Sequence, residues 1–390
     1  MKEYTIGFPI GYFNGWMGGS VLASNFTNAA LQASKNCTLN VKNILLYDVS
    51  GSDISIPECG YLVVGRNQIN GGAILREFII SSLYDDLYLY KNLRIACLSL
   101  NVDVLGPSYH DLGNDFPIPW SAYIPDFQHR HYPRFFSEAD ISSRNQMFSA
   151  ILRNSNVVFV NSLSVINDIN KFYSLSEINQ SIKKLPEARH FFEESEDVED
   201  LLDEFKISRN YFIVCSQQWM HKKHDTVILA FSDFLSRFNV ECDLVITGEL
   251  IDYRNPKLNA EIQELINKHK INHRVRYLGL IERNKQLCLI SNAKSLIQAS
   301  LIEGGPGASG VLEAASMDTK IIASDIPANL EMSFGRHTFF RSENIESLSK
   351  AMQIAYFSEV KNKNPILKIE ADGVNMSLGL QLNRILISQT

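Results

Sequence analysis

Short apolar runs rich in β-branched residues alternate with amphipathic stretches along this 390-residue chain. Such alternation is typical of parallel α/β sheets, in which helices connect successive buried strands. In the first half we expect strands at Tyr4–Pro9, Asn43–Val49, Gly60–Val64, Leu93–Leu98, Ser121–Ile124 and Asn156–Asn161. Helices are expected at Gly19–Ser34 and Ala73–Tyr88.

A second series of the same kind follows an acidic segment, Glu193–Glu204, which is either a solvated linker or a helix face. Its expected strands are Tyr211–Cys215, Cys242–Thr247, Val275–Leu278, Ser295–Ala299 and Lys320–Ala323. Its expected helices are Asp225–Phe238, Asn259–His269, Asn284–Asn292, Ser309–Met317 and Ile345–Ala355. A chain of this length usually divides into domains. We therefore predict two Rossmann-like domains, 1–205 and 206–375, with a last helix at about 376–390 that is a candidate to rejoin the first.

The charge balance argues against nucleic acid as a partner. Lys and Arg number 37 against 43 Asp and Glu, which gives a net charge of −6, and no long basic run occurs. Duplex binding relies on clustered basic residues that neutralise phosphates. The sequence contains no signal-peptide pattern and no apolar run of membrane-spanning length, and its six cysteines lack metal-site spacing. We expect a cytoplasmic protein with reduced thiols.

The segment Ile302–Ala314 is rich in glycine where a strand is expected to give way to a helix. Glycine lets the backbone approach a ligand, and the free N–H groups at a helix start favour a phosphate. The candidate phosphate-binding residues are Gly304, Gly305, Gly307, Ala308 and Ser309. Glu303 and Glu313 flank them and can accept hydrogen bonds from sugar or ribose hydroxyls. An ordinary glycine-rich turn with two surface carboxylates is the alternative.

A second candidate, Cys215–Asp225, directly follows the first expected strand of the second series. Ligands bind at the carboxyl ends of strands in open α/β sheets. Either Lys222 or Lys223 can offset the charge of a diphosphate leaving group there. A solvated basic turn is the alternative, and composition does not distinguish the two lysines.

Two further loops lie in the first half. Gly18 and Gly19 stand between the first expected strand and helix, where they permit close approach of a ligand. Ile124–Phe136 holds Asp126, His129 and further basic residues, and histidine can bond a hydroxyl or titrate near neutrality. A structural polar loop is the alternative. The spacing of two histidines could suggest a metal, but no further ligands accompany them, so we expect none.

Taken in order, these four segments resemble the GT-B-fold glycosyltransferases, in particular retaining glycosyltransferase family four. Ser300–Gly304, Glu313–Ala314 and Ile321–Pro327 are similar to the family's Pro-Ser-x-x-Glu-Gly, Glu-Ala and Val-Ile-Ala-Ser-Asp-Ile-Pro motifs. Tyr277–Gly279 is similar to its Phe-Leu-Gly strand end, and Ile124–Phe136 to a PDFQH…PxFF signature of a bacterial branch. The resemblance implies two Rossmann-like domains that face each other across a cleft.

The resemblance also implies the residues that contact a nucleotide-sugar donor: Gly18, Gly19, Gln217, Lys222, Leu280, Ile281, Gly304, Gly305, Gly307, Ala308, Ser309 and Glu313. Among them Lys222 matches the diphosphate-binding lysine, and Glu313 matches the glutamate that holds the ribose. Glu303 matches the glutamate at the donor sugar. His129 or Asp126 would lie near the reacting sugar or acceptor.

The chain departs from the family pattern at three places. Nine residues, 304–312, separate the two glutamates where the family has seven. Gln217 stands where the family has an arginine, which removes one positive charge. Pro125-Asp126 replaces a His-Asp pair near the acceptor.

The implied reaction moves a sugar from a nucleoside-diphosphate sugar to an acceptor hydroxyl, with retention of configuration and without a metal or other cofactor. Bacterial glycan or surface-polysaccharide assembly is the implied role. The acceptor would be a glycan or a lipid-linked saccharide, which is compatible with peripheral contact at the inner membrane face. Two alternatives stay open: a GT-B-fold nucleotide-sugar epimerase, and a catalytically silent nucleotide-sugar-binding subunit.

Overall fold

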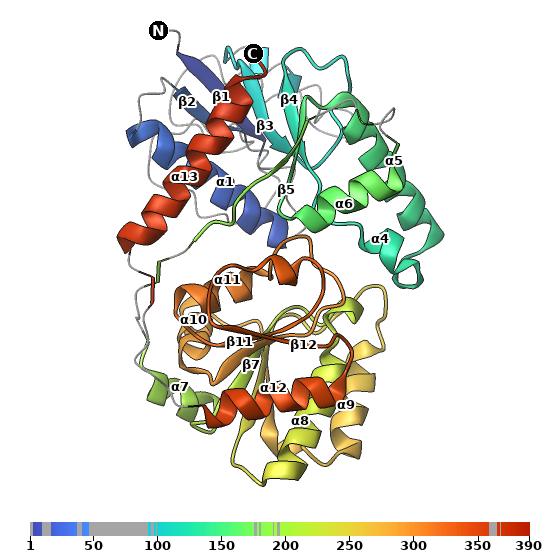
Figure 1. The fold of residues 1–390 in the computed structure, drawn as a ribbon, viewed down its shortest axis with the longest axis vertical. Helices are drawn as coiled ribbons and strands as arrows, with labels where there is room; N and C mark the ends of the chain where they lie inside the picture. Colours follow the sequence, from blue (N-terminus) through green and yellow to red (C-terminus); the bar gives the residue numbers. More distant parts are fainter. Residues whose placement is uncertain are drawn as a thin grey trace, which may run out of the picture.

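The computed structural model describes residues 3–9, 17–36, 41–46, 93–94, 97–98, 100–174, 178, 181–189, 191–192, 196–358, 365–366 and 368–390. They form two α/β domains, one above the other in Figure 1. Within these residues each domain holds a six-stranded sheet in which the paired strands are parallel. The predicted pair of parallel α/β domains is confirmed.

The first sheet has the strand order β2-β1-β3-β4-β5-β6. Its strands are β1 (Tyr4–Pro9), β2 (Val41–Leu46), β3 (Val104–Ser108), β4 (Trp120–Tyr123), β5 (Val157–Val160) and β6 (Ser181–Lys184). The described helices of this part are α1 (Met17–Asn36), α4 (Gln128–His131), α5 (Glu138–Asn154) and α6 (Leu163–Phe172). Figure 1 shows α5 and α6 at one side of the sheet and α1 at the other.

The second sheet has the order β12-β11-β10-β7-β8-β9. Its strands are β7 (Tyr211–Cys215), β8 (Asp243–Thr247), β9 (Val275–Gly279), β10 (Ser295–Gln298), β11 (Ile321–Ser324) and β12 (His337–Phe340). Its helices are α7 (Val198–Phe205), α8 (His224–Phe238), α9 (Leu258–Lys268), α10 (Arg283–Asn292), α11 (Ser309–Ser316) and α12 (Ile345–Phe357). The chain moves outward from β7 through β8 to β9 and then returns to β10 on the other side of β7. The order therefore reverses between β7 and β10, and such a reversal opens a crevice at the carboxyl ends of the strands.

Helix α8 shows why this sheet is stable. Val227, Phe231 and Phe234 lie on one face of the helix and are buried against Phe212 and Leu244 of the sheet. Their spacing of three and four residues is that of one helical stripe. Full burial of one such phenylalanine contributes about 2–3 kcal/mol relative to exposure.

Helix α13 (Lys368–Ile387) returns to the first domain and packs on α1. It runs across α1 in Figure 1. Leu378, Leu382 and Leu386 join the core formed by β1 and its neighbours. The two helices are so close that a Cβ added at Gly379 would lie 1.8 Å from the carbonyl oxygen of Ala29. Only glycine fits there.

The expected strand Leu93–Leu98 is wrong, because its described residues, 93–94 and 97–98, are helical. Leu93 and Cys97 are both buried at a spacing of four, which is a helical pattern, and a short apolar run does not distinguish strand from helix. Strand β3 takes the place in the sheet instead. The expected strand Gly60–Val64 and helix Ala73–Tyr88 lie outside the described residues.

The acidic segment contains α7, whose Leu201 and Leu202 are buried, so this part of it is a helix face rather than an extended linker. The side chain of Asp197 caps the helix by accepting a hydrogen bond from the Glu199 N–H. In the described parts of the chain, no helix is both long and apolar enough to cross a bilayer.

Candidate functional site

A pocket lies where β7 and β10 end and α11 begins. Ser216, Lys222, Gln298, Ser300 and Gly310 are among its lining residues. Because β7 and β10 are neighbours on either side of the reversal in strand order, their carboxyl ends converge on this pocket. Both loops that the sequence singled out in the second half therefore meet here.

Several polar groups of the pocket have no partner within the described structure. The Nε2 of Gln298 and the Oγ of Ser300 are buried and make no hydrogen bond there. Among the described side chains, none caps the start of α11. Unpaired buried donors are costly, and they favour a polar ligand that accepts hydrogen bonds. The N-terminal end of α11 adds positive potential to the same place.

Asn329 joins the lining of this pocket to the glycine loop. Its Oδ1 accepts a hydrogen bond of 3.2 Å from the N–H of Gly307, and its Nδ2 donates to Gln298 Oε1 at 2.8 Å. Gly307 has a φ of +75°, which favours glycine, and a Cβ there would lie 2.4 Å from a methyl carbon of Val311. Sequence reasoning missed Asn329, because an asparagine after the Ile-Pro pair carries no signal of the contacts it makes.

The two adjacent lysines point to different partners. Lys222 lines the pocket, and its Nζ lies 2.5 Å from Glu303 Oε1; both side chains are 12% exposed. Lys223 adopts a left-handed backbone conformation with φ 53°, which ends the 3-10 turn Met220–Lys222 and turns the chain. Its Nζ pairs with Asp225 Oδ2 at 2.7 Å. The geometry thus distinguishes Lys222 from Lys223, which composition did not.

Glu313 is buried on α11 and is held by Arg283 at the start of α10. The guanidinium bonds both carboxylate oxygens: Nη1 donates to Oε2 at 3.1 Å, and Nη2 donates to Oε1. The Arg283 side chain is half exposed, whereas that of Glu313 is nearly buried. Arg283 was not predicted from the sequence.

Leu280, which follows β9, is exposed.

Gln217 lies in the loop that follows β7. Its Nε2 is 3.5 Å from Glu249 Oε2, a long contact to an exposed carboxylate. Because glutamine is uncharged, position 217 adds no positive charge to the pocket.

Two buried histidines support the same loop. His224 Nε2 lies 3.0 Å from the Oγ of Ser216, which lines the pocket, and burial lowers the pKa of His224 to about 4. Burial also lowers the pKa of His221, with a further contribution from the nearby charge of Lys222. Both rings are therefore neutral at neutral pH.

In the first domain, Asp126 and His129 have different surroundings. A Cβ added at Gly304 would lie 1.8 Å from the carbonyl oxygen of Pro125, so Asp126 adjoins the glycine loop of the other domain. Asp126 accepts hydrogen bonds from the N–H and the Nε2 of Gln128. His129 is 1% exposed, with Nε2 3.0 Å from Asn145 Oδ1, and burial lowers its pKa to about 4. This position favours a supporting role for His129.

Gly18 and Gly19 lie within the first turn of α1, which begins at Met17, rather than in a loop before it. Helix α1 follows β1 along the chain and precedes the parallel strand β2, so the start of α1 lies at the carboxyl edge of the first sheet. Figure 1 shows that this edge faces the second domain.

The histidine pair of the PDFQH segment has partners other than a metal. His131 Nε2 lies 2.8 Å from Asp168 Oδ1, and His129 is bonded to Asn145. Among the described residues, no group of three or more His, Cys, Asp or Glu side chains is placed to hold a metal ion.

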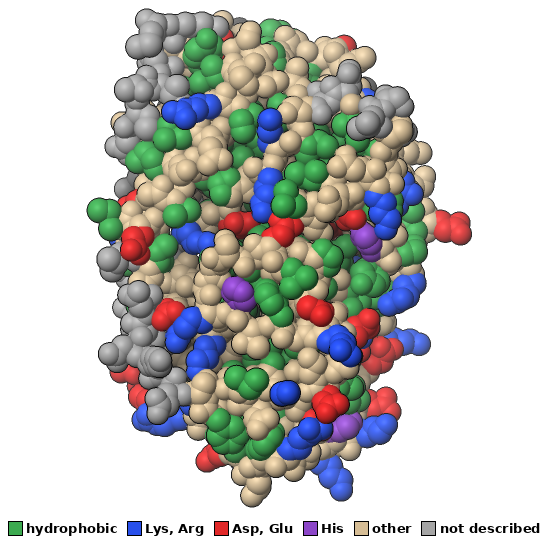
Figure 2. Space-filling model, in the orientation of Figure 1, with side chains coloured by type: hydrophobic (Ala, Val, Ile, Leu, Met, Phe, Trp, Pro, Cys, Tyr) green, Lys and Arg blue, Asp and Glu red, His purple; other side chains and the backbone are tan. Residues whose placement is uncertain are grey.

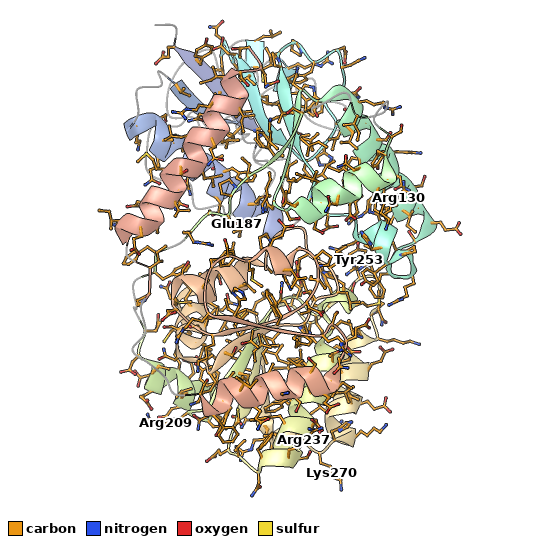
Figure 3. All side chains as sticks on the ribbon, in the orientation of Figure 1. Arg130, Glu187, Arg209, Arg237, Tyr253 and Lys270 are labelled. Carbon is orange, nitrogen blue, oxygen red and sulfur yellow. The ribbon has the colours of Figure 1, made fainter. Side chains whose placement is uncertain are left out.

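The two domains touch at the glycine loop. Ser162 Oγ donates to the carbonyl of Gly304 at 2.9 Å, and the hydroxyl of Tyr132 donates to that of Leu301 at 3.3 Å. Figure 3 shows Glu187 and Tyr253 at the level where the domains meet. On the face drawn in Figure 2, acidic and basic side chains are interspersed, without the extended basic surface of a nucleic-acid-binding protein.

Comparison with known proteins yields a family match and several similar structures. Residues 197–366 match the family described as glycosyl transferases group 1. No curated protein matches the sequence of this chain.

Three solved structures superpose over nearly the whole chain. HepE of Anabaena, crystallised with UDP and glucose, is 10% identical over 99% of both chains with a TM-score of 0.63. Sucrose-phosphate synthase of Thermosynechococcus elongatus is 14% identical over 99% of this chain and 95% of its own, with a TM-score of 0.60. WaaG, a glycosyltransferase involved in lipopolysaccharide biosynthesis, is 12% identical over 99% and 95%, with a TM-score of 0.58.

At these identities the likeness shows the fold, which is the GT-B architecture of two Rossmann-like domains. Together, the shared fold and the family match over residues 197–366 support a GT-B glycosyltransferase.

Proposed function

We propose that this GT-B protein is a retaining glycosyltransferase of family four, which transfers a sugar from a nucleoside-diphosphate sugar to an acceptor hydroxyl. One observation carries the proposal. Where the strand order reverses, Lys222, the start of α11 and the unpartnered donors of Gln298 and Ser300 line one pocket. One cation together with N–H and O–H donors is complementary to an anionic phosphate group, as in a diphosphate.

The donor would lie along the carboxyl edge of the second sheet. Lys222 and the N–H groups of Gly304, Gly305, Ala308 and Ser309 would bind the diphosphate, and Glu313 would hold the ribose hydroxyls. The backbone near Leu280 and Ile281 would contact the base. Gly18 and Gly19, at the facing edge of the first domain, would approach the diphosphate from the other side.

During transfer, the bond between the anomeric carbon and the diphosphate oxygen breaks while a bond to the acceptor oxygen forms, and the proton of the acceptor hydroxyl passes to the leaving diphosphate. Negative charge develops on the leaving diphosphate, and Lys222 and the start of α11 would stabilise it. Glu303 would bind hydroxyls of the donor sugar, and Asp126 would lie on the acceptor side. Since these groups supply the positive charge, we expect transfer without a divalent metal.

The acceptor is proposed to be a glycan or a lipid-linked saccharide in bacterial surface-polysaccharide assembly, with peripheral contact at the inner membrane face. The likeness to WaaG and the PDFQH signature support this choice. Tyr253, which is exposed near the level where the domains meet, offers an aromatic face on which a sugar ring can stack.

The test is a thermal-shift panel of UDP-, GDP-, dTDP-, ADP- and CMP-sugars with a chelator present. A ligand that binds only the native state raises the Tm. We expect one nucleotide class to raise it, and we expect Lys222→Ala and Glu313→Ala to reduce the shift strongly while Lys223→Ala keeps it. Sugar transfer from that donor is then followed with candidate acceptors.

Other outcomes would favour the alternatives. If no nucleotide sugar shifts the Tm, the proposal is overturned. A donor that binds but is never consumed would identify a silent binding subunit, which the uncharged Gln217 favours. Conversion of the donor to an isomer without any acceptor would identify an epimerase.

A further inference from the structure

Glu331, the last residue of the 3-10 turn Asn329–Glu331, reaches from the second domain to the first. Its Oε2 accepts a hydrogen bond of 2.8 Å from the N–H of Leu163, and its Oε1 accepts one of 2.8 Å from the N–H of Ser164. Lys184 Nζ donates to Oε2 at 2.7 Å. The Glu331 side chain is only 14% exposed. One carboxylate therefore holds three groups of the other domain.

These contacts complete the start of α6. The first N–H groups of a helix have no partner within it, and negative charge there is favourable. Ser162 satisfies the N–H of Val165 at 3.1 Å, whereas the N–H groups of Leu163 and Ser164 bond to Glu331. The cap of α6 is thus divided between the two domains. Separation of the domains would leave both amides without this partner.

The same turn is joined to the pocket. Asn329, two residues before Glu331, bonds both Gly307 of the glycine loop and Gln298 of the pocket lining. From the first domain, Ser162 bonds the carbonyl of Gly304 in that loop. A ligand that fixes the glycine loop therefore also fixes the turn that carries Glu331.

We propose that Glu331 is a positioning residue, an interdomain latch that holds the domains closed and transmits occupancy of the pocket to the start of α6. The latch itself is independent of the proposed function, and only the transmitted response depends on a nucleotide being bound. Closure of this kind excludes water and brings acceptor-side and donor-side residues together.

Amide hydrogen exchange of the whole chain tests the latch directly, at the peptide that contains Leu163 and Ser164. Glu331→Gln keeps the shape but loses the charge and can accept from only one of the two N–H groups. We expect at least about tenfold faster exchange of these amides, as for the loss of one charge-assisted hydrogen bond. We also expect a larger radius of gyration by small-angle scattering. Lys184→Met should give a smaller increase in exchange and in the radius of gyration. Glu346→Gln, which alters an exposed glutamate in the first turn of α12, should change neither quantity.

Transmission is tested with UDP as the probe. In the wild type, saturating UDP should slow exchange at Leu163 and Ser164, although neither residue lines the pocket. In Glu331→Gln this slowing should be lost while UDP still protects the glycine loop. A residue with a merely structural role would not separate the two responses.

The outcomes distinguish the latch from the proposed function. Wild-type exchange and dimensions in ligand-free Glu331→Gln overturn the latch, whether or not the protein transfers sugar. If UDP and the other nucleotides do not bind, the proposed function fails, but the ligand-free comparison still decides the latch. If Glu331→Gln does not fold, Lys184→Met supplies the same comparison: unchanged exchange and dimensions in it overturn the latch.

Discussion

Lys222 Nζ and Glu303 Oε1 form a nearly buried ion pair, 2.5 Å apart, and Lys222 lines the proposed diphosphate site. The carboxylate neutralises the lysine when no phosphate is present. In the proposed function, a diphosphate would share or replace this partner and would release Glu303 toward the donor sugar. The pair would therefore link the binding of the phosphates to the freedom of the glutamate.

Lys222→Ala should weaken UDP binding by about tenfold to a hundredfold, because one charge-assisted contact to the diphosphate is lost. Lys223→Ala is the matched control and should change the Kd less than about twofold, since Lys223 pairs with Asp225 instead. Isothermal titration calorimetry measures both. Because Lys222→Ala leaves Glu303 unpaired, the double variant Lys222→Ala/Glu303→Gln is measured as well. Equal losses in the two lysine variants would contradict the assignment.

Gln217→Arg should tighten binding of UDP by about threefold to tenfold. The substitution restores the charge that the resemblance places beside the diphosphate, and an added cation also makes binding more sensitive to salt. The Kd is measured at low and high ionic strength, with Gln217→Met as the uncharged control. A Kd that does not respond to the arginine at either salt concentration would place Gln217 away from the phosphates.

Arg283→Ala should lower the Tm of the ligand-free protein yet enlarge the shift that UDP produces. The guanidinium occupies both oxygens of Glu313, so a ribose must compete with it for the carboxylate. A half-exposed ion pair contributes up to about 1 kcal/mol, which limits the gain in affinity to about fivefold. Glu313→Gln is the converse variant and should bind UDP more weakly. Weaker binding in Arg283→Ala would mean that the arginine itself contacts the nucleotide.

The stability of the fold should fall between about pH 6.5 and about pH 4, partly because of buried histidines. Burial lowers the pKa of His129 and of His224 to about 4, so between these limits the unfolded chain binds more protons than the native one. The free energy of unfolding then rises with pH, by at most ~1.4 kcal/mol per pH unit for each histidine. The stabilising contribution of each histidine is fully present above the pKa of that histidine in the unfolded chain. It is lost as the pH falls toward the native pKa.

Urea unfolding of His224→Gln at several pH values measures this contribution. The variant should show a flatter pH dependence than the wild type, whereas His273→Gln, at an exposed position, should not. If both variants keep the wild-type slope, His224 does not contribute to it.

Five of the six described strands of the second domain could be predicted, because buried strands appear as apolar runs bounded by turn residues. Strand β12, which is only partly buried, was missed. Tyr211–Cys215 is reproduced to the residue. Strand β3 was missed because it contains Gly106 and Pro107, which disfavour a strand; here the pairing with β4 shifts register between Leu105 and Ser108, which accommodates the proline. A Cβ at Gly106 would lie 2.5 Å from the ring of Phe8, so the glycine is required by packing that the sequence does not reveal.

The residues of the candidate site also fall into those that the sequence predicted and those that it did not. Lys222, Glu303 and the glycine loop carry local motifs, and each motif follows a recognisable strand. Glu331 carries none, because its partner Leu163 lies 168 positions away in the sequence. Its role exists only once the two domains meet. Arg283 is similar, since its partner Glu313 is 30 positions distant and belongs to another helix.

Helix α13 also bears on how the protein is made. Leu378, Leu382 and Leu386 cover a core that includes Ile6 and Phe8, yet the ribosome synthesises the entire second domain before it reaches them. Throughout that interval the nascent first domain has an uncovered apolar face, a state that favours aggregation and recruits chaperones. Translation of the second domain thus sets the minimum time for which the first must wait to complete its fold.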